Sequence, residues 1–241
     1  MSARTLVLLP GLLNDGTVWQ GVIDRLAPGI EARVMDLSHA ASVPAMAEAV
    51  LAATADIQQP FTIAGFSMGG YVTLELLSRN PERFAGVLLQ STAAQPETDG
   101  QRKVRVSNIA RASGASADFA GVCRDLVAAG LSPAGQADAA LVQSLMAMFE
   151  RMGPEVFVRQ SKAVMERADH TATVRALAVN ISLRVGIACG ELDRITPLSW
   201  SRRMAEACPT ARFQPIPGAG HLAPCEAPDP IAGLINELMQ P

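Results

Sequence analysis

Short apolar runs alternate with longer segments of helical periodicity over much of the chain. Apolar runs of strand length lie at residues 5–9, 32–37, 61–66, 85–90, 183–189 and 211–216. Helical spacing of apolar positions covers residues 43–57, 70–79, 197–207 and 230–239. Strands that alternate with helices are typical of β-α-β units, which build a parallel sheet covered on both faces. The pattern therefore predicts an α/β fold with a mostly parallel sheet.

One long interval breaks this alternation. Residues 93–182 contain no convincing strand, and their apolar positions instead fit about three or four amphipathic helices. Breaks are expected at Ser113-Gly114, at residues 130–135 and at Gly153-Pro154. We expect residues 93–182 to form a helical lid inserted into a core made of residues 1–92 and 183–241.

The sharpest local feature is the G-x-S-x-G pattern at residues 65–69, with Ser67 at its centre. It follows an apolar run and precedes a helical pattern, which is the context of a nucleophile elbow. In that elbow, a strained turn exposes the serine hydroxyl above the sheet, and flanking glycines leave room for the turn. The alternative is a glycine-rich turn with an idle serine, because so short a pattern is common by chance. The strand before it and the helix after it favour Ser67 as a nucleophile.

A serine hydroxyl needs a base to take its proton, and the chain has only three histidines. His221 follows the glycine-containing segment 217–220, just after an apolar run, where a parallel sheet places its site. We interpret His221 as the base, against the alternative of a histidine in a surface loop. His170 lies in a charged segment and is expected to be solvated. His39 follows the second predicted strand; a structural role is favoured over one in lining a pocket.

The acid that orients the base is expected in the segment 190–194, after another predicted strand. Asp193 is favoured over its rival Glu191, because it lies further into the loop and can turn toward His221. The chain order Ser67, Asp193, His221 is then the order found in hydrolases that have a nucleophile elbow.

An oxyanion hole requires two N–H donors near the nucleophile. The amide of Met68, directly after Ser67, is one candidate. The second is expected from the loop after the first strand, where Gly11 lets the backbone approach a substrate and Leu12 is the candidate donor.

These motifs together resemble the small, lid-bearing bacterial α/β-hydrolases, which include carboxylesterases, enol-lactonases and cofactor-free C–C bond hydrolases. The resemblance lies in residues 8–11 with Trp19, in residues 65–70, in residues 190–193 with Pro197, and in residues 217–221 with Glu226 and Pro228. It covers nearly the whole chain outside the predicted lid. It implies an α/β-hydrolase fold, with a sheet of about six strands and helices on both faces.

The sequence departs from that family at two places. Pro10 stands where the family usually has a histidine, so the oxyanion loop must be anchored differently. The family usually carries an antiparallel hairpin before the first parallel strand, and only residues 1–4 precede Thr5 here. The resulting sheet edge is expected to need covering, and a homodimer is one way to cover it.

Composition narrows the classes of partner. Lys+Arg number 20 and Asp+Glu 23, for a net charge of −3, which does not call for nucleic acid or an anionic membrane. The four cysteines form no C-x-x-C pair and indicate reduced thiols. The apolar start of the chain is broken by Pro10 and has no cleavage site, so a cytoplasmic location is expected. Neither a metal nor an organic cofactor is implied.

The predicted function is hydrolysis of a small carboxylic ester or lactone through a Ser-His-Asp acyl-enzyme. A C–C bond hydrolase, a menaquinone-pathway-type lyase with the same triad, and a non-catalytic binding module remain alternatives. A haloalkane dehalogenase is disfavoured, because it needs a carboxylate at position 67. The apolar segment 145–149 is expected mainly to pack the lid on the core. The basic residues Arg102, Lys103, Arg105 and Arg111 are expected to form a solvated helix face rather than a substrate site.

Overall fold

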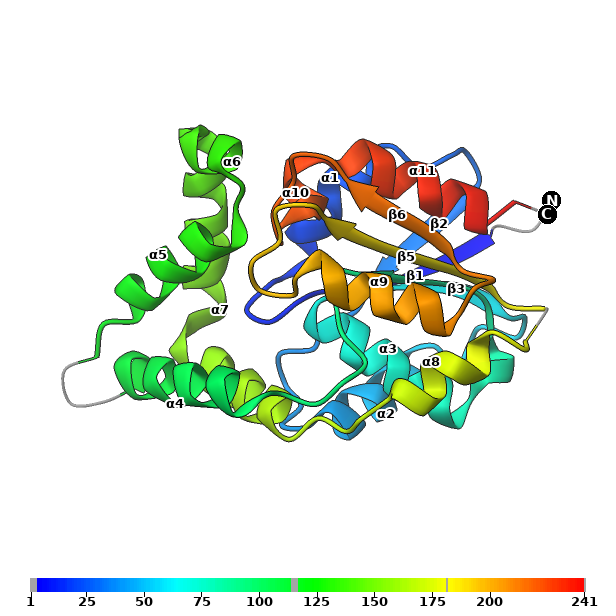
Figure 1. The fold of residues 1–241 in the computed structure, drawn as a ribbon, viewed down its shortest axis with the longest axis horizontal. Helices are drawn as coiled ribbons and strands as arrows, with labels where there is room; N and C mark the ends of the chain where they lie inside the picture. The colour runs from blue at the N-terminus through cyan, green and yellow to red at the C-terminus, as the bar shows by residue number, and fades with distance from the viewer. Residues whose placement is uncertain (1–3, 114–116, 181, 241) are drawn as a thin grey trace.

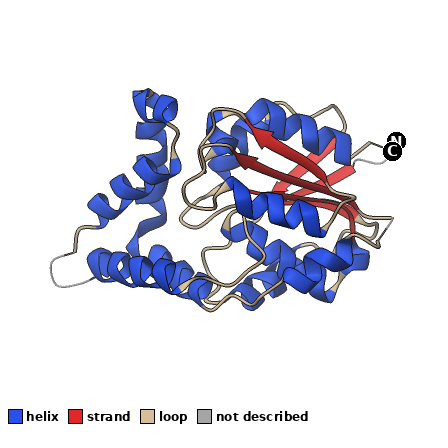
Figure 2. Ribbon diagram, in the orientation of Figure 1, coloured by secondary structure: helices blue, strands red, loops and turns tan. Residues whose placement is uncertain are grey.

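The computed structural model describes residues 4–113, 117–180 and 182–240. Its centre is a six-stranded sheet in which each neighbouring pair is parallel, with the order β2-β1-β3-β4-β5-β6 (Figures 1 and 2). The strands are β1 (Arg4–Leu9), β2 (Ile30–Val34), β3 (Phe61–Phe66), β4 (Phe84–Gln90), β5 (Arg184–Gly190) and β6 (Arg212–Ile216). The predicted parallel α/β architecture is confirmed.

The second strand differs from the prediction, which placed it at residues 32–37. β2 pairs with β1 from Ile30 to Val34, and the N–H of Met35 donates one further hydrogen bond to the carbonyl of Leu8. The chain then turns at Asp36, whose carboxylate accepts from the N–H of Ser38. The apolar pattern misplaced the strand because Leu37 is buried in the loop and not in the ladder.

Helices cover both faces of the sheet, as the pattern predicts (Figure 1). One face carries α1 (Gln20–Ile23) and α11 (Pro228–Leu238), which pack on each other. The other carries α2 (Val43–Ala53), α3 (Met68–Arg79), α8 (Thr171–Leu177) and α9 (Leu198–Ala207). Alternate residues of each central strand point to opposite faces, so the core forms one apolar cluster on each side of the sheet. Short helices η1 (Gly16–Trp19), η2 (Pro81–Arg83) and α10 (Ala223–Glu226) lie in the connections.

Local signals explain several helix boundaries. Ser42 caps α2 by accepting from the N–H of Ala45, and a proline lies in the first turn. Asp138 caps α7 (Ala139–Met165) by accepting from two backbone N–H groups of the first turn. α3 ends before Asn80-Pro81, because proline disfavours helical backbone in the residue before it.

A helical insertion lies between β4 and β5. It begins with α4 (Asp99–Ser113), α5 (Phe119–Gly130), α6 (Pro133–Ala137) and α7 (Ala139–Met165), and α8 completes it. α7 is broken at Gly153, whose φ of 80° and ψ of 167° are not helical, just before Pro154. The expected break at Ser113-Gly114 follows the end of α4, and Gly114 lies outside the described residues. In the described part of the chain, no helix is long and apolar enough to cross a membrane.

Candidate active site

Ser67 occupies the sharp turn between β3 and α3. Its φ of 52° and ψ of −112° are strained for a residue with a side chain, at a cost of about 1–3 kcal/mol. Two contacts hold this turn in place. The N–H of Ser67 donates to the carbonyl of Gln90 at 2.9 Å, and the Thr92 hydroxyl donates to the carbonyl of Ser67 at 2.8 Å. The neighbouring strand β4 and the residues after it therefore fix the backbone that presents the Ser67 side chain.

Close backbone contacts explain two glycines of the elbow. A Cβ at Gly65 would lie 2.4 Å from the carbonyl oxygen of Gly69. A Cβ at Gly69 would lie 2.3 Å from the carbonyl oxygen of Leu9 on β1. Neither contact involves a side chain that is able to move away, so the turn requires glycine at both positions.

The structure brings Ser67, His221 and Asp193 into one chain of hydrogen bonds. His221 Nε2 lies 3.0 Å from Ser67 Oγ, and His221 Nδ1 lies 2.8 Å from Asp193 Oδ2. The three residues follow β3, β6 and β5, whose carboxyl ends meet at one edge of the sheet. With Nδ1 protonated, the imidazole donates to Asp193 and its Nε2 is able to accept the Ser67 proton.

Asp193 is buried, and its ionised form is stabilised. Burial raises the pKa of its carboxyl. The charge and hydrogen bond of His221 and the hydrogen bonds of Thr196 together lower the pKa by more than burial raises it, so the pKa lies below its ordinary value. Thr196 donates its N–H to Oδ1 and its hydroxyl to Oδ2, each at 2.8 Å. Ile195 adds an N–H bond to Oδ1 at 2.9 Å. Thr196 was not among the predicted site residues, and only its place three residues after Asp193 could have indicated it.

The rival acid and the other histidines lie elsewhere. Glu191 is exposed, and His39 is an exposed partner of Asp36 on the surface. The expectation that His170 is solvated is wrong. His170 is buried, and its Nε2 lies 3.0 Å from Glu75 Oε2. The reason is that α8 begins directly after His170 and packs on α3, which carries Glu75.

The loop after β1 is held by the helical insertion. Leu13 has a φ of 60°, and its N–H donates to Gln160 Oε1 at 2.7 Å. Gln160, fully buried on α7, also donates to the carbonyl of Leu37 at 3.3 Å. The N–H of Asn14 donates to the carbonyl of Gly11. Among the described residues, no protein acceptor contacts the N–H of Leu12. No sequence signal indicated Gln160, which lies 147 positions from its partner Leu13.

A cavity of about 580 Å³ opens beside Ser67 and His221. Leu12 and Met68, the two candidate oxyanion donors, both line it. Because Met68 is the first residue of α3, its N–H has no carbonyl partner within the helix.

The insertion supplies much of the cavity wall. The segment 145–149 packs largely into the core, but Phe149 and Phe157 of α7 also face this cavity. The expected solvated basic face of α4 is wrong for Arg105. Arg105 lines the cavity, and its guanidinium pairs with Glu97, whose side chain is 1% exposed. The contact was not visible in the sequence, because Glu97 precedes the helix and is buried only by the fold.

The loop that carries His221 is anchored to the insertion. Glu226 accepts from the N–H of Gly220 at 2.8 Å and from the N–H of Ser132 at 2.9 Å. Leu222 donates its N–H to the carbonyl of Gly130 at the end of α5. Two segments far apart in the sequence therefore share one hydrogen-bonded junction.

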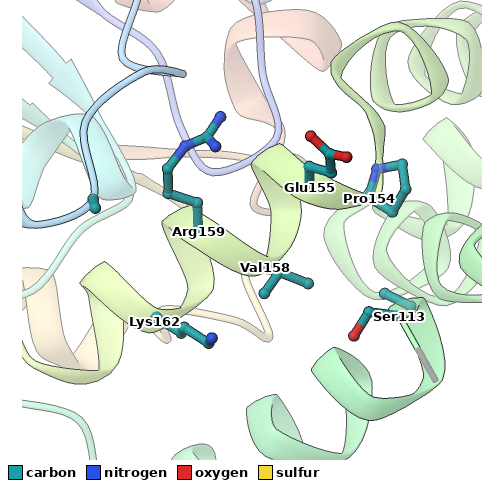
Figure 3. A pocket seen from close by; sticks show the side chains of 8 residues that line it. Ser113, Pro154, Glu155, Val158, Arg159 and Lys162 are labelled. Atoms are coloured by element: carbon teal, nitrogen blue, oxygen red, sulfur yellow. The ribbon is translucent and has the colours of Figure 1, made fainter.

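A second hollow of about 440 Å³ lies on the insertion between α4 and α7. Figure 3 shows Ser113 of α4 across from Val158 and Lys162 of α7. None of the three residues of the hydrogen-bonded chain lines it. Within the described ranges, no three His, Cys, Asp or Glu side chains gather closely enough to hold a metal ion.

The sequence and the fold of this chain are similar to those of known proteins. A sequence profile described as "Alpha/beta hydrolase family" matches residues 6–234. A pimeloyl-[acyl-carrier protein] methyl ester esterase of Chromobacterium violaceum is 25% identical over 90% of this chain and 86% of its own length. A thermophilic esterase from Thermogutta terrifontis superposes with a TM-score of 0.86 at 21% identity, over 99% of this chain and 92% of that one. The enol-lactonase from Burkholderia xenovorans gives a TM-score of 0.85 at 17% identity, over the same shares.

Proposed function

The chain belongs to the alpha/beta hydrolase family, and on this premise we propose that it is a serine hydrolase that cleaves carboxylic esters through an acyl-enzyme. The observation that carries the proposal is the hydrogen-bonded chain from Ser67 through His221 to Asp193, with Ser67 open to a cavity. The esterases among its relatives support the choice of an ester bond.

In the proposed reaction, Ser67 Oγ attacks the ester carbonyl carbon and its proton passes to His221 Nε2. The oxyanion accepts hydrogen bonds from the amides of Leu12 and Met68. The bond to the alkoxy oxygen then breaks, and His221 returns the proton to form the alcohol. Water attacks the acyl-enzyme in the same way, giving the carboxylic acid and restoring Ser67. Asp193 stabilises the imidazolium that forms in each half of the cycle.

Methyl esters of short acids are the first substrates to measure, because the relative from Chromobacterium violaceum is named as a methyl ester esterase. The decisive comparison is wild type against Ser67→Ala. We expect kcat to fall by about 10³-fold or more, since the nucleophile is lost. Ser78→Ala is the matched control: Ser78 lies further along α3, and its hydroxyl bonds to the helix backbone.

A fluorophosphonate probe gives a second readout that does not depend on the choice of ester. The wild type and Ser78→Ala should be labelled once per chain, and Ser67→Ala should remain unlabelled. Equal ester turnover by wild type and Ser67→Ala would remove the proposal. So would a wild type that neither turns over esters nor accepts the probe.

A further inference from the structure

The cavity beside Ser67 has two chemically different walls. α7 contributes Phe149 and Phe157, which are apolar. α4 contributes Gln101, Arg105 and Asn108, which lie four and three positions apart and therefore share one face of the helix. A ligand that fills this cavity meets an apolar surface on one side and hydrogen-bond donors on the other.

Arg105 is held in place by a buried carboxylate. Its Nε donates to Glu97 Oε1 at 2.8 Å, and its Nη2 lies 2.7 Å from the same oxygen as part of the ion pair. No protein acceptor contacts its Nη1 in the part of the chain that the structure describes. The guanidinium is therefore ordered before a ligand binds, and it keeps donors for that ligand. A rigid guanidinium fork matches the geometry of a carboxylate.

The positive charge of Arg105 is not cancelled by Glu97. Glu97 also faces Arg167, whose Nη1 lies 3.7 Å from Glu97 Oε1. Two guanidinium groups thus share one carboxylate, which leaves an excess of one positive charge. The Arg167 guanidinium lies over the ring of Tyr71 at 4.4 Å, and Tyr71 itself lines the cavity.

The other charged residues of the wall preserve this excess. Arg194 donates to the backbone carbonyl of Ala128. Asp125, the acidic residue among those that line the cavity, is paired with Arg111 at 2.7 Å. Arg111 also pairs with Asp118, and Arg124 lies 3.8 Å from Asp118, so the two carboxylates of this group face two guanidinium groups. The cavity therefore favours an anion over a cation.

Two side-chain amides add donors on the same face of α4. Among the described residues, the Asn108 side chain has no hydrogen-bond partner in the protein. Gln101 accepts from Thr98 through its Oε1, which leaves its Nε2 donors for a ligand.

We infer that the α4 wall, formed by Arg105, Asn108 and Gln101, binds a carboxylate at the far end of the substrate. This inference rests on the proposed ester hydrolysis. The substrate class is then an ester whose acyl chain ends in a carboxylate, such as a half-ester of a dicarboxylic acid. The ester carbonyl lies at Ser67, the chain lies against the apolar wall, and the carboxylate contacts Arg105.

The test compares three methyl esters that release the same alcohol and differ in their distal group. Monomethyl adipate carries a carboxylate at the far end of its chain, dimethyl adipate is neutral, and methyl 6-aminohexanoate carries an ammonium group there. The wild type should show the highest kcat/KM for the anionic ester and the lowest for the cationic one. The ratio of anionic to neutral ester should fall as salt concentration rises, because salt screens partly exposed charges.

Two variants remove one positive charge each from α4. Arg105→Gln should lower the anionic-to-neutral ratio of kcat/KM by about tenfold, the effect of one charge-assisted hydrogen bond. Lys103→Gln should leave that ratio unchanged, because Lys103 is exposed and does not line the cavity.

A third variant separates charge recognition from a structural role of the ion pair. Glu97→Gln removes the shared carboxylate, so it should maintain or increase the preference for the anion. If the pair served only to hold the fold, Glu97→Gln and Arg105→Gln would lower the ratio alike. That result, or a wild type that does not discriminate between the three esters, would overturn the carboxylate site. Turnover of dimethyl adipate without discrimination would leave the proposed ester hydrolysis intact, whereas no turnover of any ester would count against that function itself.

Discussion

The buried side chain of Gln160 connects the helical insertion to the loop that carries the proposed oxyanion donor. Replacing it by methionine keeps a similar length and removes both hydrogen bonds. The N–H of Leu13 and the carbonyl of Leu37 then lose their side-chain partner inside the protein. Each unsatisfied buried group costs about 1–3 kcal/mol, so Gln160→Met, which leaves two of them, should lower the free energy of unfolding by about 2–6 kcal/mol. For a chain of this size, the melting temperature should fall by roughly 4–24 °C.

The same substitution is expected to lower kcat and to leave KM nearly unchanged. Leu13 is held at a positive φ, and without Gln160 the loop is expected to relax and to move the Leu12 amide. Losing one oxyanion donor costs about 10²–10³-fold in kcat, and a partial displacement should cost less. KM should change little, because the oxyanion forms only after binding.

Steady-state kinetics on a methyl ester and a thermal melt measure the two effects on the same preparation. Gln160→Glu is the matched variant, since it keeps an acceptor for the Leu13 N–H and should lose less kcat than Gln160→Met. If Gln160→Met melts earlier but keeps the kcat of the wild type, the loop is positioned without Gln160 and the reasoning is refuted.

Other perturbations test the remaining parts of the site. Asp193→Asn should lower kcat by about 10³–10⁴-fold, measured on a methyl ester, because the imidazole loses the carboxylate that holds its tautomer and stabilises the imidazolium. Since the pKa of Asp193 is lowered by folding, its carboxylate stabilises the fold at neutral pH, and this stability is lost as the pH falls below about 4. In urea melts, the free energy of unfolding should therefore fall less steeply with acid pH for Asp193→Asn than for the wild type. Gly65→Ala should reduce soluble expression and the melting temperature, because its Cβ would meet the backbone of Gly69 at 2.4 Å; a stable, fully active variant would contradict this contact. Glu226→Ala should raise hydrogen exchange at Gly220 and Ser132, and unchanged protection would show that other contacts hold the junction.

Local patterns in the sequence predicted most of the scaffold. The alternation of apolar runs and helical segments predicted the α/β fold, and the motifs indicated the family to which the chain belongs. Ser67, Asp193 and His221 were candidates because each follows a predicted strand, and the carboxyl ends of parallel strands meet at one edge. The structure places His221 within hydrogen-bond distance of both Ser67 and Asp193.

The contacts that the sequence did not reveal join positions far apart in the chain. His170 and Glu75 are 95 positions apart, and only the packing of α8 on α3 buries them together. Gln160 lies on a helix whose apolar pattern says nothing about the loop after β1. Arg105 sits in a basic run that is typical of a solvated surface, and its partner Glu97 is buried by the fold alone. Patterns of hydrophobicity predict which residues are buried, but not which polar partners meet there.

The junction at Glu226 bears on how this scaffold is redesigned. Protein engineers often treat a helical insertion above an active site as a cover that they can trim or exchange to admit larger substrates. Here the segment between α5 and α6 provides the N–H of Ser132 for Glu226, and Gly130 provides a carbonyl for Leu222, next to His221. A transplant from another hydrolase would have to reproduce both backbone groups in register. In this protein, the unit of exchange is the insertion together with the loop of residues 217–226.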